Sequence, residues 1–248
     1  MMLKSYAADL HIHTALSPCA EDEMTPRNIL RTARDRGLDL IAVTDHNSAE
    51  NAGAVMKAAN EFGVTVWPGM EVQTREEVHV VCLFDRLEPA LAWQTEVHRH
   101  LPDLPNRPEY FGNQRIMDSE GRIVGENPRL LLTATGFSVE DVARRVEELG
   151  GVAIPAHVDR PSFSLLGTLG LIPAEPKFPA LEISRRITPE EAVDKFPELN
   201  GRVLYKASDA HRLPEISEKR TVIFLAEPDL AEFRKACRRE DGRRIIVQ

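Results

Sequence analysis

Six of the eight histidines in this chain lie in short segments that end in polar residues and are accompanied by carboxylates. These segments are D-L-H-I-H-T at 9–14, T-D-H-N at 44–47, G-M-E-V at 69–72, V-H-V-V at 78–81, P-A-H-V-D-R-P at 155–161 and S-D-A-H at 208–211. Imidazole and carboxylate groups are the ligands that zinc, manganese and iron take in proteins. Gathering so many of them predicts a multinuclear metal centre and hydrolytic chemistry on a bound substrate.

The spacing of these residues places them together. His11 and His13 are two residues apart on an expected strand, so both project to the same face. Asp209 and His211 repeat that spacing near the other end of the chain. His46 and His157 each end an apolar strand, which is the edge where a β/α barrel keeps its chemistry. The pattern therefore predicts that these residues ligate metal.

Glu71 is the natural bridging ligand, because one carboxylate can contact two cations. Gly69 just before it is expected to kink the strand and aim Glu71 inward. His79 lies eight residues after Glu71 at the start of the next strand, and we include it among the ligands.

Two aspartates next to the ligands and two other histidines are not expected to bind metal. Asp9 and Asp45 adjoin ligand histidines, and we expect them to orient imidazole rings rather than to coordinate metal. His98 and His100 lie in a helical, polar stretch and are expected on the solvated surface.

Strand-like and helix-like segments alternate along the chain. Strands are expected at 7–13, 40–44, 64–71, 78–84, 152–157, 180–184, 203–208 and 221–226, and helices at 25–37, 48–62, 89–101, 138–149 and 229–239. Such alternation with strands rich in Val, Ile and Leu predicts an α/β fold with a parallel, buried sheet that is closed or nearly closed. We take residues 1–248 as a single domain.

Residues 102–137 break this rhythm and hold four prolines. Within this range, segments 114–117 and 122–124 flank D-S-E-G and predict a hairpin. We interpret the range as an insertion, which serves either as a lid over the site or as a surface decoration.

Composition limits the partners. The net charge of −8 disfavours a large electrostatic footprint on nucleic acid, so long nucleic acid is not an expected partner. No apolar run approaches the roughly 18 residues of a membrane span, and no signal-peptide pattern is seen. The three scattered cysteines do not form a disulfide framework. We expect a soluble, cytoplasmic protein; its oligomeric state is left open.

Taken together, the segments D-L-H-I-H-T, T-D-H-N, G-M-E, P-A-H and S-D-A-H resemble the sequential motifs of the PHP family, named for polymerase and histidinol phosphatase. The resemblance implies a distorted, TIM-like (β/α)7 barrel with two or three divalent metals. It assigns His11, His13, Glu71 and Asp209 to one metal. It assigns Glu71, His79 and His157 to a second, and His46 and His211 to a third.

The sequence departs from the family pattern at the third metal. Family members often carry a histidine or aspartate where this chain has Cys19, within S-P-C-A-E-D at 17–22. A thiolate would favour zinc or iron over manganese. Cys19 could equally be a small buried residue, and Glu21 and Asp22 compete with it as ligands.

The expected reaction is attack of a metal-bridging hydroxide on phosphorus. Neither a G-x-S-x-G elbow nor a phosphate-binding loop is found, which disfavours a covalent serine and a nucleotide P-loop. Asp209 and His211 could supply the proton for the leaving group. Arginine suits phosphate through its two-pronged guanidinium, and Arg160, Arg185 and Arg186 follow strands on the expected active face.

We therefore predict a metal-dependent phosphoesterase that hydrolyses a small phosphomonoester or a nucleotide. A nuclease or exonuclease of the same family is the first alternative. A non-catalytic, metal-binding regulatory domain is the second.

Overall fold

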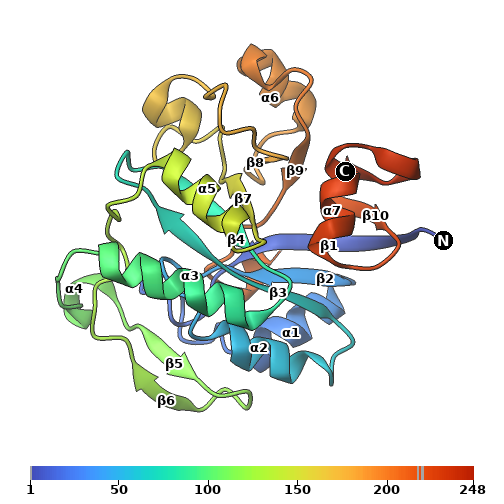
Figure 1. The fold of residues 1–248 in the computed structure, drawn as a ribbon. Coiled ribbons are helices and arrows are strands. Elements are labelled where there is room, and N and C mark those ends of the chain that lie inside the picture. Colours follow the sequence, from blue (N-terminus) through green and yellow to red (C-terminus); the bar gives the residue numbers. More distant parts are fainter. Residues whose placement is uncertain (1, 217, 219–220) are drawn as a thin grey trace.

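The computed structural model describes residues 2–216, 218 and 221–248. The strands are β1 (Lys4–Ile12), β2 (Leu40–Val43), β3 (Thr65–Gln73), β4 (His79–Leu83), β5 (Arg115–Met117), β6 (Ile123–Glu126), β7 (Val152–Pro155), β8 (Leu181–Ile183), β9 (Leu204–Lys206), β10 (Thr221–Leu225) and β11 (Arg244–Val247). The helices are α1 (Pro26–Asp35), α2 (Ala52–Ala59), α3 (Leu87–His100), α4 (Pro108–Phe111), α5 (Val139–Glu148), α6 (Pro189–Lys195) and α7 (Leu230–Cys237), as Figure 1 shows. The sequence patterns do not predict α4, α6 or β11.

Helix starts follow the expected capping chemistry. The Thr25 side chain accepts a hydrogen bond from the backbone N–H of Asn28, with proline as the first residue of α1. Ser138 and Asp141 form a capping box at the start of α5. Helix α2 begins four residues later than predicted, because Ser48 and the backbone of Ala49 bind the side chain of Gln94 instead.

The main sheet has seven strands in the order β11-β10-β1-β2-β3-β4-β7. The pairs β1–β2 and β2–β3 are parallel, as predicted. The prediction of an all-parallel sheet is wrong for the remaining pairs, since β4 runs antiparallel to both β3 and β7, and β10 to both β1 and β11. The physical reason at β4 is the short link after Gln73, which can close a hairpin but cannot hold a crossover helix.

The sheet is curled, and contacts outside the main ladder continue around it. Strands β8 and β9 form a separate parallel pair. The N–H of Val158, just after β7, donates to the carbonyl of Glu182 in β8, and the N–H of His13 donates to the carbonyl of Ala210 after β9. The α/β class is therefore confirmed with a curled, mixed sheet, while the seven-unit (β/α) barrel stays a prediction.

Gly69 permits a close approach of two strands rather than the expected kink. A Cβ atom at this position would lie 2.4 Å from the carbonyl oxygen of Cys82 in β4. Glycine is needed there because only it lets the β4 backbone come this near to β3.

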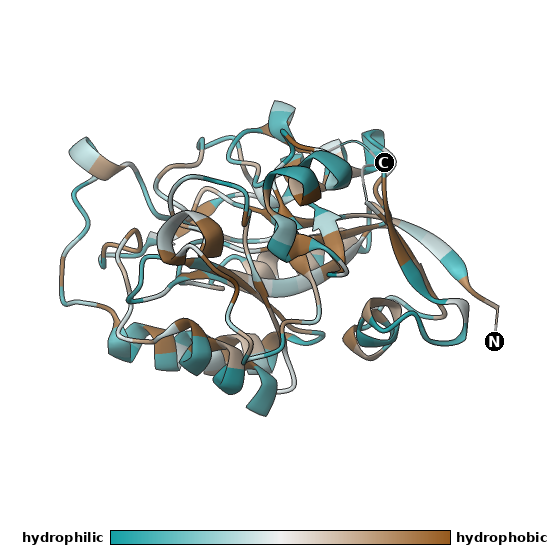
Figure 2. Ribbon diagram, turned by 90° about the horizontal axis from the view of Figure 1, so that it is seen from above, coloured by the Kyte–Doolittle hydropathy of each residue, from teal (hydrophilic) through white to brown (hydrophobic). Residues whose placement is uncertain are grey.

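The core lies on both faces of the sheet. Alternate residues of β2 face opposite sides, with Ile41 packed beneath the helices α1, α2, α3 and α5, and Leu40 on the other face. On that second face Trp67 contacts Phe233 of α7, with ring centroids 5.7 Å apart. Figure 2 shows the resulting pattern, in which brown strands run through the middle and the helices turn teal faces outward.

The range 102–137 contains α4 and the predicted hairpin, which is formed by β5 and β6. Its backbone is tied to the loops that follow β1 and β2. Asn51 holds both Arg115 and Met117 of β5, and Asn47 donates to the carbonyls of Leu131 and Thr133. This range is thus anchored beside the edge that carries the predicted ligands, and both its status as an insertion and its action as a lid stay predictions.

Among the described residues, none of the helices combines the length and the apolar character that a membrane crossing requires.

Candidate metal centre

The predicted ligands meet at one edge of the curled sheet. His11 and His13 stand at the end of β1, His46 follows β2, His157 follows β7, and Asp209 and His211 follow β9. His79 belongs to the same edge because β4 runs antiparallel, so its first residue lies where the parallel strands end. The hairpin of β3 and β4 therefore explains why His79 can be a ligand although it stands at the start of a strand, which is unusual in a barrel.

Glu71 in β3 is the hub of this cluster and is almost fully buried. Its Oε1 lies 2.9 Å from Nδ1 of His79 and 3.2 Å from Nε2 of His157. Its Oε2 lies 2.9 Å from Nδ1 of His46. Each carboxylate oxygen thus faces a different set of imidazoles, which is the arrangement that a bridging carboxylate requires.

Three groups of side chains place their ligand atoms within 4.8 Å of one another: His11, His13, Glu71 and Asp209; His46, Glu71 and His79; and His13, His46 and His211. The first group matches the set that the resemblance assigned to one metal. The other two overlap with the second and third sets but are not identical to them. His157 belongs to none of these three groups, but it contacts Glu71 and so lies beside them.

Cys19 lies beside the third group. The residue is exposed, but its sulfur interacts with the imidazoles of His46 and His211. Partial burial of the sulfur acts to raise the pKa of the thiol, and the interactions with His46 and His211 lower that pKa to about 6. This places a thiolate-forming group next to the predicted third metal.

A serine that the sequence reasoning missed fixes the orientation of His13. The Ser17 hydroxyl donates its proton to Oδ1 of Asp45 at 2.7 Å and accepts from the backbone N–H of His46. Because that proton is already used, Nδ1 of His13, 2.9 Å from the Ser17 oxygen, must be the donor. The Nε2 lone pair of His13 therefore points into the centre, and Asp45 acts through Ser17.

Glu182 in β8 fixes the orientation of the His11 imidazole, and the sequence did not predict this role either. Nδ1 of His11 donates to the Glu182 carboxylate, lying 3.1 and 3.0 Å from its two oxygens. The hydroxyl of Tyr205 donates to Oε2 of Glu182, and the backbone N–H of His157 donates to its Oε1. One signal in the sequence could have revealed this residue, since Glu182 is a lone carboxylate inside the apolar segment A-L-E-I.

The electrostatics of the centre keep its carboxylates ionised. Burial alone would raise the pKa of Glu71, but His79, His11 and His46 hold it well below its usual value. Burial likewise opposes ionisation of Asp209, yet His11 and His13 hold the pKa of that carboxyl well below its usual value. Burial and the charges of His211 and His46 lower the pKa of His13, which favours its neutral, metal-binding form.

The donor set fits divalent cations. Oε2 of Glu71 is buried and, although it lies 2.9 Å from Nδ1 of His46, it makes no hydrogen bond of acceptable geometry among the described residues. Nε2 of His11 and Nε2 of His13 face each other at 3.1 Å, and both Nδ1 atoms are already committed to other partners. Two lone pairs at this distance repel unless a cation or proton lies between them. Oε2 of Glu71 and the Nε2 atoms of His11 and His13 are therefore the buried atoms that a bound metal would coordinate.

The predicted arginines divide into two groups. Nη1 of Arg160 lies 2.6 Å from Oδ2 of Asp209, so this residue is at the centre. Arg185 pairs with Glu215, which in turn accepts from the backbone N–H of His211. Arg186 is exposed, and no described side-chain contact joins it to the ligands.

Asp9, His98 and His100 are three further residues to which the sequence assigned a role or a location. Asp9 accepts from the backbone N–H of Ser208 and so anchors the segment that carries Asp209, and its role in orienting a ligand imidazole stays a prediction. His98 is not a freely solvated residue, because it is half-buried and contacts the carbonyl of Asn47 at 3.1 Å. His100 is exposed, as predicted.

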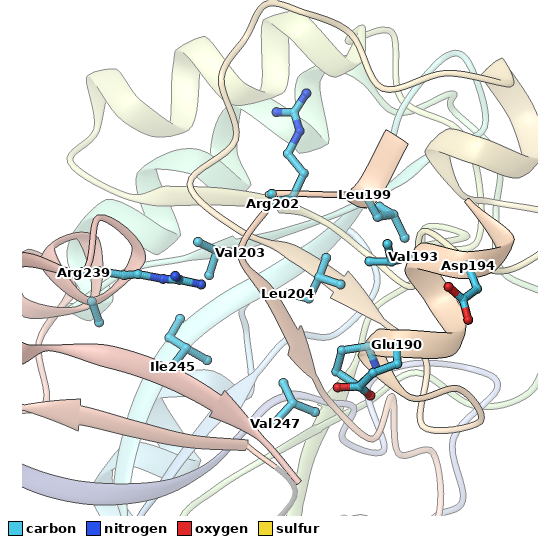
Figure 3. Close-up of a pocket in the computed structure, with 13 residues that line it drawn as sticks. Glu190, Val193, Asp194, Leu199, Arg202, Val203, Leu204, Arg239, Ile245 and Val247 are labelled. Atoms are coloured by element: carbon cyan, nitrogen blue, oxygen red, sulfur yellow. The ribbon is translucent and has the colours of Figure 1, made fainter. Parts of the chain in front are cut away.

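The mouth of the centre is a hollow of about 200 Å³ lined by His46, Glu71, His79, His157, Arg160, Ser162, Phe163, Asp209 and His211. A larger hollow of about 510 Å³ lies between α6, β9 and β11. Figure 3 shows that it is lined by aliphatic residues such as Val193 and Leu204 and by the charged residues Glu190, Asp194, Arg202 and Arg239. The metal ligands line the first hollow and not the second.

Comparisons with known proteins agree with this geometry. The family model described as PHP domain matches residues 9–150. An uncharacterized protein of Methanocaldococcus jannaschii is 40% identical over 173 residues, which cover 64% of this chain and 72% of the relative. The 5'-3' exoribonuclease of Haemophilus influenzae is 30% identical over 197 residues, covering 63% of this chain and 69% of the relative.

A further relative is the 3',5'-nucleoside bisphosphate phosphatase of Chromobacterium violaceum, 36% identical over 88 residues, or 34% of this chain and 30% of that protein. Among solved structures, the endonuclease Q of Pyrococcus furiosus superposes with a TM-score of 0.68 at 21% identity. The superposition covers 98% of this chain, which spans 58% of that larger protein. A likeness at this identity concerns the fold.

Proposed function

The chain belongs to the PHP domain family, and from this premise we propose that it is a metal-dependent phosphoesterase whose substrates are nucleoside phosphates. The proposal places two or three divalent ions, zinc, manganese or iron, among the clustered side chains. It includes the roles of the individual ligands and of Arg160, which are inferred from their positions.

One observation carries the proposal. Glu71 stands between two imidazole sets that together with Asp209 form three overlapping groups of ligand atoms. Two cations held by one carboxylate suit displacement at phosphorus, because the attacking and the leaving oxygen both need stabilisation. Bound divalent ions would supply a water that is acidic enough to react near neutral pH and would offset the phosphate charge.

The protein groups do the remaining work. Arg160 is half-exposed at the mouth, with its guanidinium beside Asp209, and is placed to bind a non-bridging phosphate oxygen. His211 lines the same hollow and stacks on His13, with ring centroids 4.1 Å apart. Water adds to phosphorus and gives up a proton, the ester P–O bond breaks, and the departing alkoxide takes a proton. We assign delivery of that proton to His211 of the Asp209–His211 pair, in the form of the centre in which His211 does not bind the third metal. The proton released by the water restores His211.

The named relatives support a nucleoside phosphate as the substrate. One is an exoribonuclease and another is a nucleoside bisphosphate phosphatase, so both act on phosphate esters of nucleosides. The exoribonuclease also keeps the nuclease alternative in play, and so does the endonuclease Q fold, which has been solved with a 27-mer duplex. These likenesses weaken the expectation, drawn from net charge, that long nucleic acid is not a partner.

A paired assay tests the proposal. The purified chain is incubated with manganese, zinc or iron and with either nucleoside monophosphates and bisphosphates or a 5'-labelled oligonucleotide. Release of inorganic phosphate from the mononucleotides, lost on chelation, is the expected result. Shortened oligonucleotides without phosphate release from mononucleotides would instead support the nuclease.

A third outcome would favour a regulatory domain. Metal-loaded protein that leaves both substrates intact would contradict an enzymatic role. Metal content is measured on the same samples, so that inactivity from missing metal is not mistaken for absence of catalysis.

A further inference from the structure

Phe163 is an exposed aromatic residue inside the mouth of the metal centre. Its side chain belongs to the lining of the hollow formed with His79 and Arg160, and the residue is 42% exposed. The remaining lining is imidazole, carboxylate, guanidinium and hydroxyl, so the Phe163 ring is the apolar surface of this site. An isolated exposed aromatic residue is ordinary, but one in a polar reaction pocket is not explained by packing.

The backbone holds this ring in place against its own preference. Phe163 has a φ of 55°, in the left-handed region that a bulky side chain disfavours. Its carbonyl accepts a hydrogen bond of 3.0 Å from the backbone N–H of His79. Strain of this kind persists only where surrounding contacts impose it, and an observed outlier at a site points to a function.

The loop around Phe163 is built to be rigid. The Ser164 hydroxyl donates to the carbonyl of Arg160 at 2.6 Å, and the Asp159 carboxylate binds both the backbone and the hydroxyl of Ser184 at 2.6 Å. A Cβ atom at Gly167 would lie 2.4 Å from the Arg160 carbonyl oxygen, so glycine permits the tight fold of the loop. Arg160 and Phe163 are therefore presented together on one preorganised segment.

One face of the ring is occupied, and the 42% exposure of the residue leaves ring surface open to a ligand. The ring stacks on the His79 imidazole, with centroids 4.9 Å apart and an interplanar angle of 25°. A flat aromatic group could stack on the surface that stays open. The hollow of about 200 Å³ is too small for a whole nucleotide, since complete ligand pockets measure about 300–1,000 Å³. A bound nucleoside phosphate must extend past the rim, and Phe163 is part of that rim.

We infer that Phe163 is the specificity-determining residue that stacks on the nucleobase of the substrate while its phosphate group engages the metals and Arg160. The inference rests on the proposed function and deepens it by naming the residue that selects nucleoside esters over aliphatic ones. Stacking of a base on an aromatic side chain tolerates every base, because each has a π-face. The residue thus selects for the presence of a base rather than for its identity.

The test compares two phosphate esters on the manganese-loaded chain. Adenosine monophosphate carries a base, and glycerol phosphate does not. Phe163→Ala is expected to lower kcat/KM for adenosine monophosphate by about tenfold or more, the size of one lost stacking contact, and to leave glycerol phosphate unchanged. Phe163→Trp keeps a ring and is expected to retain the preference. Leu91→Ala removes a hydrophobic side chain that is 37% exposed on α3 and serves as the matched control.

Metal content and binding are measured on every variant. Calorimetric titration with adenosine monophosphate and with inorganic phosphate gives the contribution of the nucleoside without relying on turnover. If the wild-type chain cleaves neither ester with metal bound, the proposed function fails. Tighter binding of adenosine monophosphate than of phosphate, lost in Phe163→Ala, would still support the inference.

Four results would overturn the inference. An equal fall for both esters, or loss of metal in Phe163→Ala, would mean that Phe163 merely supports His79. A kcat/KM that stays at the wild-type value for both esters would remove Phe163 from substrate recognition. Loss of discrimination in Phe111→Ala instead would place the base on the insertion, where Phe111 is also 42% exposed.

Discussion

The guanidinium of Arg160 and the carboxylate of Asp209 form an ion pair, with Nη1 2.6 Å from Oδ2. The other carboxylate oxygen of Asp209, Oδ1, lies 3.1 Å from Nε2 of His13. One side chain thus links the loop that is expected to hold phosphate with a residue that is expected to hold metal. An incoming phosphate would share this guanidinium with Asp209.

Arg160→Ala is predicted to weaken catalysis while the metals stay bound. Removal of a charge-assisted hydrogen bond should cost about 1.5–3 kcal/mol, which lowers kcat/KM by roughly ten- to a hundred-and-fifty-fold. Arg160→Lys should recover only part of the loss, because a point charge cannot reproduce a two-pronged contact. Steady-state kinetics at fixed metal occupancy measure this. An unchanged kcat/KM would transfer the role to Arg185 or Arg186.

Glu71→Gln is predicted to reduce the occupancy of two metals together. An amide can offer only one oxygen, whereas the two oxygens of Glu71 face separate imidazole sets. His100→Ala is the control, since His100 is exposed and lies away from the centre on α3. Elemental analysis of both variants decides the matter, and equal metal loss from the two would show that the ligands are misassigned.

Glu182→Gln is predicted to weaken metal binding without removing a ligand. Glutamine can present an N–H group to Nδ1 of His11, which then no longer needs to carry the proton, so the Nε2 lone pair is lost from the centre. Changes to such orienting partners typically reduce metal affinity by about 10–100-fold. The matched control is Glu232→Gln. Glu232 is a buried carboxylate on α7, and it forms an ion pair with Arg243. Competition with a chromophoric chelator reports the affinity; similar values for the two variants would contradict the orienting role.

Metal affinity is predicted to rise with pH across the neutral range. Burial alone would lower the pKa of His11, but Glu182, Glu71 and Asp209 raise it well above 6.5. Cys19 and Glu71 raise the pKa of His46 in the same sense, again against burial. Below these raised pKa values the metal must displace protons from the metal-free protein, and this competition disappears as the pH rises through them.

Zinc titrations at about pH 6, 7 and 8 measure this effect. Each displaced proton should steepen the rise by about tenfold per pH unit. Proton release in weakly buffered solution gives an independent count. An affinity that stays constant over this range would contradict protonated imidazoles in the metal-free centre.

The ligand cluster could be predicted from the sequence because its signal is local. Histidines at strand ends are visible in segments of four to seven residues, and parallel strands bring their ends to one edge. The residues that orient the imidazoles were missed for the opposite reason. Glu182 is 171 positions from His11, so their contact is created by the fold and leaves no spacing to detect. Ser17 lies four positions from His13 but in a loop without a recognisable pattern.

The strand directions could be predicted only in part. Alternation of strands and helices indicated a parallel sheet, which holds for β1, β2 and β3. The direction of β4 depends on the short link after Gln73, whereas its apolar pattern is that of a buried parallel strand. The β3–β4 hairpin also determines the position of His79. The wrong prediction for the direction of β4 and the unexplained position of His79 therefore have the same cause.

Native metal stoichiometry measured together with phosphate-ester hydrolysis tests the central claim most directly. Protein purified without chelators is expected to contain at least two divalent ions per chain and to release phosphate from nucleoside monophosphates. Removal of the ions should abolish hydrolysis, and returning manganese, zinc or iron should restore it. A metal-free chain that remains fully active would contradict the account.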